Sequence, residues 1–253
     1  MKLFDLHGKK AIVTGGSRGM GLGAAEGLLE SGAHTVLIGR TEKVFQTAER
    51  LKAAGYLCDG IQADVGIPEE RKKAFENAVG ILGDLDILVN AAGITLRHKS
   101  IDYPREEWDR ILEVNLTAPF ELSQEAAKIF VKKHYGKIIN FGSMLSFFGA
   151  ITAPGYAATK GAVAQLTKSC CNEWAADGIN VNCIAPGWMA TDMNAALMDP
   201  DLPRYKEITG RIPAGRWGKT DDIKGLAVFL ASHASDYVNG AIIPIDGGYL
   251  VRQ

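Results

Sequence analysis

The sequence predicts a single α/β domain built on a doubly wound, mostly parallel sheet with helices on both faces. Short apolar runs rich in β-branched residues alternate with amphipathic stretches, which is the rhythm of successive β-α-β units. Runs such as AIVTG, TVLIG and DILVN are almost continuously apolar, as expected of strands covered on both faces. We therefore expect right-handed crossovers between parallel strands.

Six strands are expected along the chain. They are Lys10–Thr14, Thr35–Gly39, Ile87–Asn90, Lys137–Phe141, Asn180–Ile184 and Ala241–Ile245. The 253 residues exceed the usual length of one domain, but α/β folds of this size commonly form one, and no repeat or linker divides residues 1–253. Pro200, Pro203 and Pro213 interrupt residues 189–216, so we expect a mobile substrate lid there.

The composition favours a soluble globular protein without nucleic-acid partners. The chain is 47% hydrophobic and 23% charged, and its net charge of −1 gives no basic field for a phosphate backbone. Cys58, Cys170, Cys171 and Cys183 form no C-x-x-C pair, so we expect reduced, mostly buried thiols and no metal site. No signal-peptide core or membrane-spanning run is present in the sequence. We expect a cytoplasmic protein without membrane partners.

A glycine-rich turn follows the first expected strand. Gly15, Gly19 and Gly21 have the spacing G-x-x-x-G-x-G between the strand and the next helix. Glycines there permit a tight turn and the close approach of a pyrophosphate, whose charge the free backbone N–H groups and the helix dipole favour. Tight packing alone would also explain such a turn, but its place after the first strand favours a dinucleotide site.

The end of the second expected strand bears on the choice of cofactor. An acidic side chain there would bind two ribose hydroxyls, whereas a basic one would bind a 2′-phosphate. This chain has Arg40 and no acid, and Arg18 lies within the glycine turn. Guanidinium groups match phosphate oxygens in a bidentate way, so NADP(H) is favoured. NAD(H) remains the alternative, because either arginine could be a surface charge or stack on the adenine.

Tyr156 and Lys160 stand four positions apart in GYAATKGA, so they share one face of a helix. A free tyrosine has a pKa of about 10, and a nearby ammonium favours the phenolate and lowers that pKa. Tyr156 could then exchange protons near neutral pH. The pair alone is common in sequences, and a half-buried helix face is the other explanation.

The whole chain resembles the short-chain dehydrogenase/reductase family. The resemblance lies in the glycine turn, the run Asn90-Ala91-Ala92-Gly93, Ser143, and Tyr156 with Lys160, in this order. It implies a Rossmann-like single domain, self-association as a homotetramer or dimer, and hydride transfer between NAD(P) and a secondary alcohol or ketone.

The same resemblance implies a catalytic tetrad of Asn115, Ser143, Tyr156 and Lys160. Tyr156 would exchange a proton with the substrate oxygen, and Ser143 would hydrogen-bond that oxygen. Lys160 would lower the pKa of the tyrosine and hold the nicotinamide ribose, and Asn115 would anchor a water that links the lysine to solvent. An isolated Ser or Asn is more often a cap or turn residue, so the joint pattern carries this assignment.

Cofactor contacts are also implied by the resemblance. They are Gly15, Ser17, Arg18, Gly19, Met20, Gly21, Arg40, Asp64, Val65, Asn90, Ala91, Gly93, Tyr156, Lys160, Pro186, Gly187 and Thr191. Asp64 and Val65 would lie at the adenine, although Asp64 could instead be a helix cap. Position 91 is often Asn in the family, and the NAAG form here leaves the backbone role intact.

Arg97 is the sharpest clue to the substrate. The chain resembles the sugar-acid branch of the family, which includes gluconate 5-dehydrogenases and 2-deoxy-gluconate dehydrogenases, and in that branch an arginine stands in this loop. The resemblance to this branch continues in the segments GSMLSFFGA, RIPAGRWG and ASDYVNGAIIPIDGG. Arg97 could clamp a carboxylate, or pair with Asp102 or Glu106 on the surface. The expected substrate pocket consists of Arg97, Ser143, Ser146, Phe148, Tyr156, Trp188 and Met189, although ordinary core packing would also explain its apolar members.

Two other functions remain open at this point. A 3-oxoacyl-thioester (acyl-carrier-protein) reductase uses the same chemistry with NADPH, and Arg97, His98 and Lys99 could form the basic surface that an acidic carrier needs. A non-catalytic nucleotide-binding or redox-sensing module could use the same fold. The intact tetrad argues against such a module.

Overall fold

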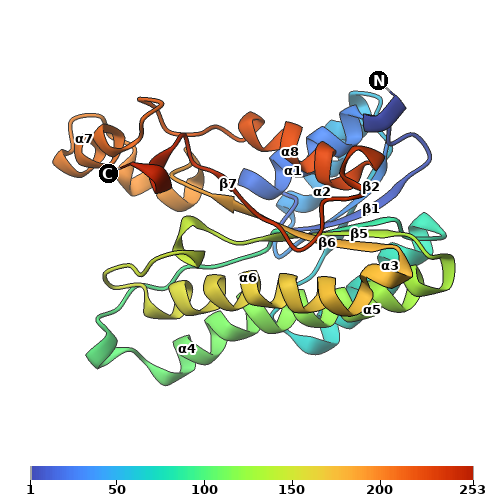
Figure 1. The fold of residues 1–253 in the computed structure, drawn as a ribbon, viewed down its shortest axis with the longest axis horizontal. Helices are drawn as coiled ribbons and strands as arrows, with labels where there is room; N and C mark the ends of the chain where they lie inside the picture. The colour runs from blue at the N-terminus through green and yellow to red at the C-terminus, as the bar shows by residue number, and fades with distance from the viewer. Residues whose placement is uncertain (1, 253) are drawn as a thin grey trace.

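A seven-stranded parallel sheet forms the centre of the computed structural model, which describes residues 2–252 (Figure 1). The strands are β1 (Lys10–Thr14), β2 (His34–Gly39), β3 (Cys58–Gln62), β4 (Ile87–Asn90), β5 (Gly136–Phe141), β6 (Ile179–Pro186) and β7 (Ile242–Ile245). Their order in the sheet is β3-β2-β1-β4-β5-β6-β7, and each neighbouring pair is parallel. The predicted doubly wound parallel sheet is confirmed.

Helices cover both faces of the sheet. They are α1 (Gly19–Glu30), α2 (Lys43–Ala53), α3 (Pro68–Leu82), α4 (Arg105–Leu112), α5 (Ala118–Lys133), α6 (Pro154–Trp174), α7 (Pro203–Arg211) and α8 (Asp221–Ala231). Shorter helical segments are η1 (Lys2–Phe4), η2 (Ser100–Asp102), η3 (Glu113–Thr117), η4 (Met144–Ser146), η5 (Ala175–Asp177), η6 (Asp192–Leu197), η7 (His233–Ser235) and η8 (Tyr249–Val251). Helices α1, α2 and α8 pack on one face, and α3, α5 and α6 pack on the other (Figure 1).

Alternation along the central strands divides the core into two layers. Ala11 and Val13 of β1 face the layer under α1 and α8, whereas Ile12 between them faces the layer under α3 and α5. All three side chains are fully buried, as expected of a strand with helices on both sides. This explains why the runs in these strands are apolar without a break.

The edge strand β3 is the one strand that the sequence did not predict. Among the strands of residues 2–252 it pairs with β2 alone, and its CDGIQ run contains a glycine and the half-buried Asp59. The carboxylate of Asp59 is 2.8 Å from the His34 ring and 2.9 Å from the Lys52 ammonium. A strand at the edge tolerates such polar side chains, so it lacks the apolar run by which the others are recognised.

The order of the strands reverses between β1 and β4. In open parallel sheets the crevice at the carboxyl ends of strands beside this reversal is where ligands bind. The glycine turn follows β1 and the Asn90–Gly93 run follows β4, so both lie at this crevice.

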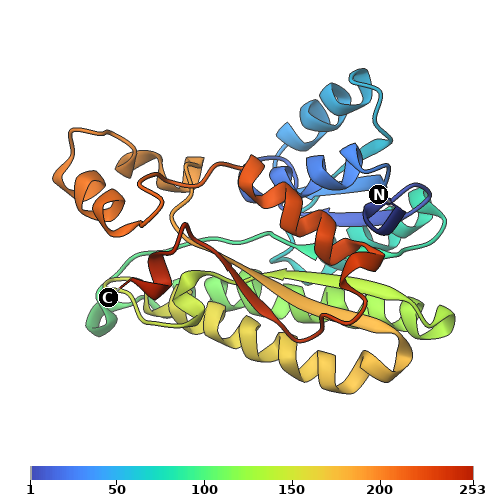
Figure 2. The same ribbon diagram turned by 45° about the horizontal axis from the view of Figure 1, so that its top comes forward.

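The segment 189–216, which we call the lid segment, contains η6 and α7. It packs through Ile208 and Ile212 on a third small core with Trp217 and Tyr249. Both views place it at the end of the molecule where the C-terminus lies (Figure 1, Figure 2).

None of the helices described in residues 2–252 has the length and apolar character needed to cross a membrane.

Candidate active site

The glycine turn forms a hollow, which we call the glycine cradle, that side chains in place of the glycines would fill. Gly15 and Gly19 have φ angles of +67° and +56°, which favour glycine. A Cβ added at Gly15 would lie 2.9 Å from the Ala92 backbone, and one at Gly21 would lie 2.4 Å from the Gly15 carbonyl oxygen. The N-cap residue of α1, Arg18, makes no side-chain capping bond, so the first amides of the helix are available to an anion. The turn therefore fits a pyrophosphate.

The two arginines expected at the 2′-phosphate have different surroundings. Arg40 is exposed after β2 and makes no ion pair with the described residues. Arg18 lies 3.4 Å from Asp192 of the lid segment, and both side chains are more than half exposed. Such an exposed pair is weak, so Arg18 remains available to a phosphate.

The expected adenine residues are held by a second arginine pair. The Asp64 carboxylate accepts hydrogen bonds from Gly66 N at 2.9 Å and from Arg110 at 2.5 Å. The Val65 carbonyl accepts one from Arg71, whose guanidinium is only 2% exposed and also binds Glu113 at 2.8 Å and Glu121. Neither Arg71 nor Arg110 belongs to a motif, so neither could be recognised from the sequence.

The Asn90–Gly93 run is fixed by polar side chains on neighbouring strands. The Thr14 hydroxyl accepts hydrogen bonds from the backbone amides of Ala91 and Ala92 at 3.2 Å. The Asn90 amide nitrogen donates to Asn140 at 2.9 Å, while its side-chain oxygen is buried and has no partner among the described residues. An unpaired buried acceptor beside the glycine cradle fits a bound ribose or nicotinamide group.

Asn115 lies fully buried in η3, a π-helical segment between α4 and α5. Its side chain accepts from the Ile94 amide and donates to the Ile94 carbonyl, both at 2.9 Å, and it also lies 3.3 Å from the Thr159 hydroxyl. The side chain is therefore committed to protein partners. The expected water contact of this side chain therefore stays a prediction, although π segments such as η3 are common at functional sites.

Gly93 lies close to both Asn115 and Lys160, two members of the expected catalytic tetrad. An added Cβ at Gly93 would lie 3.4 Å from the Asn115 side-chain oxygen and 3.7 Å from the Lys160 ammonium. Lys160 is 5% exposed and donates to the Phe141 carbonyl oxygen at 2.6 Å.

The pKa of Tyr156 depends on burial, Ser143 and Arg97, and not on Lys160 as expected. Burial raises it, while the hydrogen bond with Ser143 and the positive charge of Arg97 lower it. The Lys160 ammonium, 5.6 Å from the centre of the tyrosine ring, is not among these causes. Burial lowers the pKa of Lys160 itself to about 8. The net pKa of Tyr156 is raised, because burial outweighs the lowering by Ser143 and Arg97, so the expected lowering by Lys160 is not found.

Ser143, Tyr156 and Arg97 line one cavity of about 70 Å³. Its walls also contain Met20, Thr95, Gly142, Met144, Leu145, Ala153, Pro186, Gly187, Trp188, Met189, Thr191, Met193 and Asn194. The cavity thus joins the expected cofactor residues Met20, Pro186, Gly187 and Thr191 with the expected substrate residues Trp188 and Met189. Thr95, Met193 and Asn194 were missed, because only their nearness to motif residues could have indicated them.

Two expected substrate residues lie outside this cavity's walls. Phe148 stacks on Tyr249 with ring centres 6.4 Å apart. The Ser146 hydroxyl donates to the Lys160 carbonyl at 2.7 Å. Arg97 is exposed and makes no ion pair with the described residues, so the alternative pairing with Asp102 or Glu106 is not formed.

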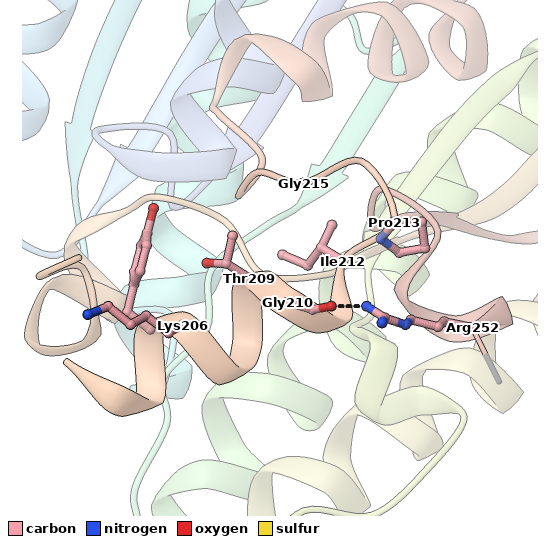
Figure 3. A pocket seen from close by; sticks show the side chains of 8 residues that line it. Lys206, Thr209, Gly210, Ile212, Pro213, Gly215 and Arg252 are labelled. Atoms are coloured by element: carbon pink, nitrogen blue, oxygen red, sulfur yellow. Dashed lines mark hydrogen bonds between the residues drawn. The ribbon is translucent and has the colours of Figure 1, made fainter. Parts of the chain in front are cut away.

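A larger hollow of about 790 Å³ lies beside α7 (Figure 3). It is lined by Tyr205, Lys206, Thr209, Gly210, Ile212, Pro213, Gly215 and Arg252, and the Arg252 side chain reaches the Gly210 carbonyl there. It shares no residue with the cavity at Tyr156, so it is not the candidate active site.

A half-buried tyrosine with a buried lysine, serine and asparagine, beside a pyrophosphate cradle, defines the site of a nucleotide-dependent oxidoreductase. Residues 15–250 match a family model described as enoyl-(acyl carrier protein) reductase. The 2-dehydro-3-deoxy-D-gluconate 5-dehydrogenase of Bacillus subtilis is 47% identical, over 98% of this chain and 97% of the relative. The protein with the same name from Dickeya dadantii is 46% identical, over 100% and 99%.

Among solved structures, the gluconate 5-dehydrogenase from Burkholderia cenocepacia in complex with NADP and tartrate has a TM-score of 0.94 and 40% identity, covering 100% of this chain and 99% of that chain. The chain belongs to the short-chain dehydrogenase/reductase family and is an oxidoreductase that acts on CH–OH groups. The resemblance seen in the sequence is confirmed.

Proposed function

We propose that the protein is an NADP(H)-dependent dehydrogenase that interconverts the secondary alcohol and the ketone of a sugar acid. The observation that carries this proposal is the position of Arg97. Its guanidinium lines the same cavity as Tyr156, is free of ion pairs with the described residues, and is close enough to lower the pKa of the phenol. A carboxylate bound there would place a neighbouring secondary hydroxyl at the tyrosine.

Tyr156 is the proton-transfer group of this proposal. In the oxidation direction its phenolate takes the proton from the substrate hydroxyl, and in the reduction direction its phenol returns that proton to the carbonyl oxygen. Ser143, which lines the same cavity and lowers the pKa of Tyr156, would hold the same substrate oxygen in place. The two side chains therefore fix where the reacting oxygen lies.

The cofactor site would consist of the glycine cradle, the Asn90–Gly93 run and the residues after β6. When bound there, NADP(H) supplies or accepts the hydride at the substrate carbon. Lys160 would hold the nicotinamide ribose, and Asn115 would keep the backbone around Ile94 in place beside it. Arg40 and Arg18 favour the 2′-phosphate form, and related structures contain NADP.

A 3-oxoacyl-thioester reductase is less well supported, despite the description of the matching family model. His98 lies 2.8 Å from Glu107, so one of the three basic residues expected to receive an acidic carrier is already paired. The relatives from Bacillus subtilis and Dickeya dadantii, matched over nearly their whole length, have sugar-acid names. A non-catalytic module is also disfavoured, because it would not need Ser143 and Arg97 around one tyrosine.

We further propose a cytoplasmic homotetramer in which the lid segment closes over the substrate. Ile151 is 90% exposed and Val251 is 82% exposed, and such apolar side chains suit a subunit contact. Sedimentation velocity tests this part, with a monomer as the contradicting result.

A substrate panel tests the proposal. Purified protein is assayed with sugar acids, polyols and acyl thioesters, each with NADP(H) and NAD(H), by the absorbance of the reduced nicotinamide. The highest kcat/KM is expected for a sugar acid with NADP(H). A preference for an acyl thioester would contradict the proposal.

A further inference from the structure

The hydroxyl of Ser146 joins the two catalytic segments of the candidate site. It accepts a hydrogen bond from the Ser143 backbone amide at 3.2 Å and donates one to the Lys160 carbonyl oxygen at 2.7 Å. Ser143 ends the segment after β5, whereas Lys160 belongs to α6. One oxygen atom therefore links the strand side of the site with its helix side.

Further contacts make this link part of a closed frame. The Ser143 hydroxyl accepts from the Leu145 amide at 3.2 Å, so Ser143 and Ser146 cap the short η4 helix reciprocally. The Lys160 ammonium binds the Phe141 carbonyl at 2.6 Å. Residues 141–146 thus hold Lys160 at its side chain and at its main chain.

The space around the Ser146 hydroxyl is tightly filled. A Cβ added at Gly142 would lie 2.9 Å from the Ser146 oxygen and 2.8 Å from the Cys183 sulfur. Ser146 is half-buried, and it does not line the cavity at Tyr156. A small donor at this position fits a structural link within the site better than contact with a substrate.

We propose that Ser146 is a positioning residue that sets the distance between Ser143 and the helix carrying Tyr156 and Lys160. The inference rests on the proposed function, because it assigns a role in that reaction. Without the hydroxyl, the Ser143 amide and the Lys160 carbonyl each lose a partner, and the loop is free to move relative to α6. Small displacements of reacting groups are costly in catalysis.

A displacement of Ser143 should change the pKa of the Tyr156 phenol. The hydrogen bond with Ser143 lowers the pKa of Tyr156, so a looser Ser143 leaves the raising effect of burial less opposed. Because the phenolate is the base in alcohol oxidation, the rate would then reach half its maximum at a higher pH. A residue that only stabilises the fold would not move this profile.

Three substitutions test the role: Ser146→Ala, Ser146→Cys and, as a matched control, Ser235→Ala. The Ser235 hydroxyl is fully buried and donates to backbone oxygens of Leu230 and Ser232. It lies in η7, whose His233 packs on Tyr135 just before β5, at the opposite ends of the strands. All variants are assayed for oxidation of a sugar acid across pH, and their melting temperatures are measured.

We expect Ser146→Ala and Ser146→Cys to lower kcat about 10- to 100-fold and to shift the pH profile upward, with the KM for NADP⁺ little changed. Ser235→Ala should lower the melting temperature and keep the wild-type kcat and profile. Wild-type kcat and pH profile in either folded Ser146 variant would overturn the inference.

Ser143→Ala separates this inference from the proposed function. If Ser143→Ala is inactive while the Ser146 variants behave as wild type, the positioning role fails and the reaction assignment stands. If Ser143→Ala turns over like wild type, the assignment of the reaction to this site fails as well.

Discussion

The Lys160 ammonium nitrogen lies 2.6 Å from the carbonyl oxygen of Phe141, the last residue of β5. This contact ties the helix that carries Tyr156 to the end of a central strand. It also leaves the buried ammonium with a neutral partner, and burial lowers its pKa to about 8. The charge of Lys160 is therefore sensitive to pH in a range that an enzyme assay can reach.

The affinity for the oxidised cofactor should fall above about pH 8. Lys160 is charged below its pKa and neutral above it, so its hydrogen bonds to ribose hydroxyls weaken as pH rises through that value. Titration of NADP⁺ by protein fluorescence between pH 6.5 and 9.5 measures the change. Lys160→Met should bind weakly and without this pH dependence; a parallel pH dependence in Lys160→Met would contradict the assignment.

Replacing Arg97 by Ala should raise the KM for a sugar acid about 10- to 100-fold, since a hydrogen-bonded charge pair is worth about 1.5–3 kcal/mol. The matched comparison is gluconate against glucitol, in which CH₂OH replaces the carboxylate. The KM for glucitol should change little. Equal increases for both compounds would remove the argument that Arg97 binds the carboxylate.

Replacing Arg40 by Ala should raise the KM for NADPH about tenfold and leave that for NADH nearly unchanged, because only NADPH carries the 2′-phosphate. Arg18→Ala should act in the same direction, although it also removes the exposed contact with Asp192. Steady-state kinetics with both cofactors measures the ratio. An equal loss for NADPH and NADH would show that the arginines do not recognise the phosphate.

Replacing Arg71 by Met should lower the free energy of unfolding by about 2–4 kcal/mol, because the change removes a buried cation and leaves two carboxylates and the Val65 carbonyl without it. Arg105→Met is the control, since Arg105 forms an ion pair with Asp109 on the surface and is 85% exposed. Urea unfolding should show no clear change for the control. Equal stability of the two variants would disprove the structural role of Arg71.

Much of the fold could be predicted from the sequence because the central strands are buried on both faces. β1 and β4 were predicted with their observed bounds, Lys10–Thr14 and Ile87–Asn90, because each is a continuous apolar run. β3 was missed because an edge strand tolerates Asp59 and Gly60. An apolar run in the sequence indicates that a strand is buried, so strands that are not buried on both faces are not recognised by it.

The residues of the candidate site that belong to motifs could be predicted from the sequence. Contacts between residues of different helices and strands could not. Ser143, Tyr156 and Lys160 were named from the sequence; the structure places Ser143 and Tyr156 at one cavity and directs the Lys160 ammonium to the Phe141 carbonyl. The direction of the Lys160 ammonium toward Phe141 depends on the packing of α6 against β5, which no local pattern records. The role of Ser146 depends on the same packing.

The central claim is that Tyr156 transfers the proton while the protein oxidises a sugar acid with NADP⁺. Its most direct test is the kcat of the wild type and of Tyr156→Phe with gluconate or a related sugar acid, together with NADP⁺ binding by both proteins. We predict turnover by the wild type, and for Tyr156→Phe a loss of turnover of at least about 100-fold with NADP⁺ binding retained. Turnover by Tyr156→Phe at the wild-type rate, or no turnover of any sugar acid by the wild type, would contradict the account.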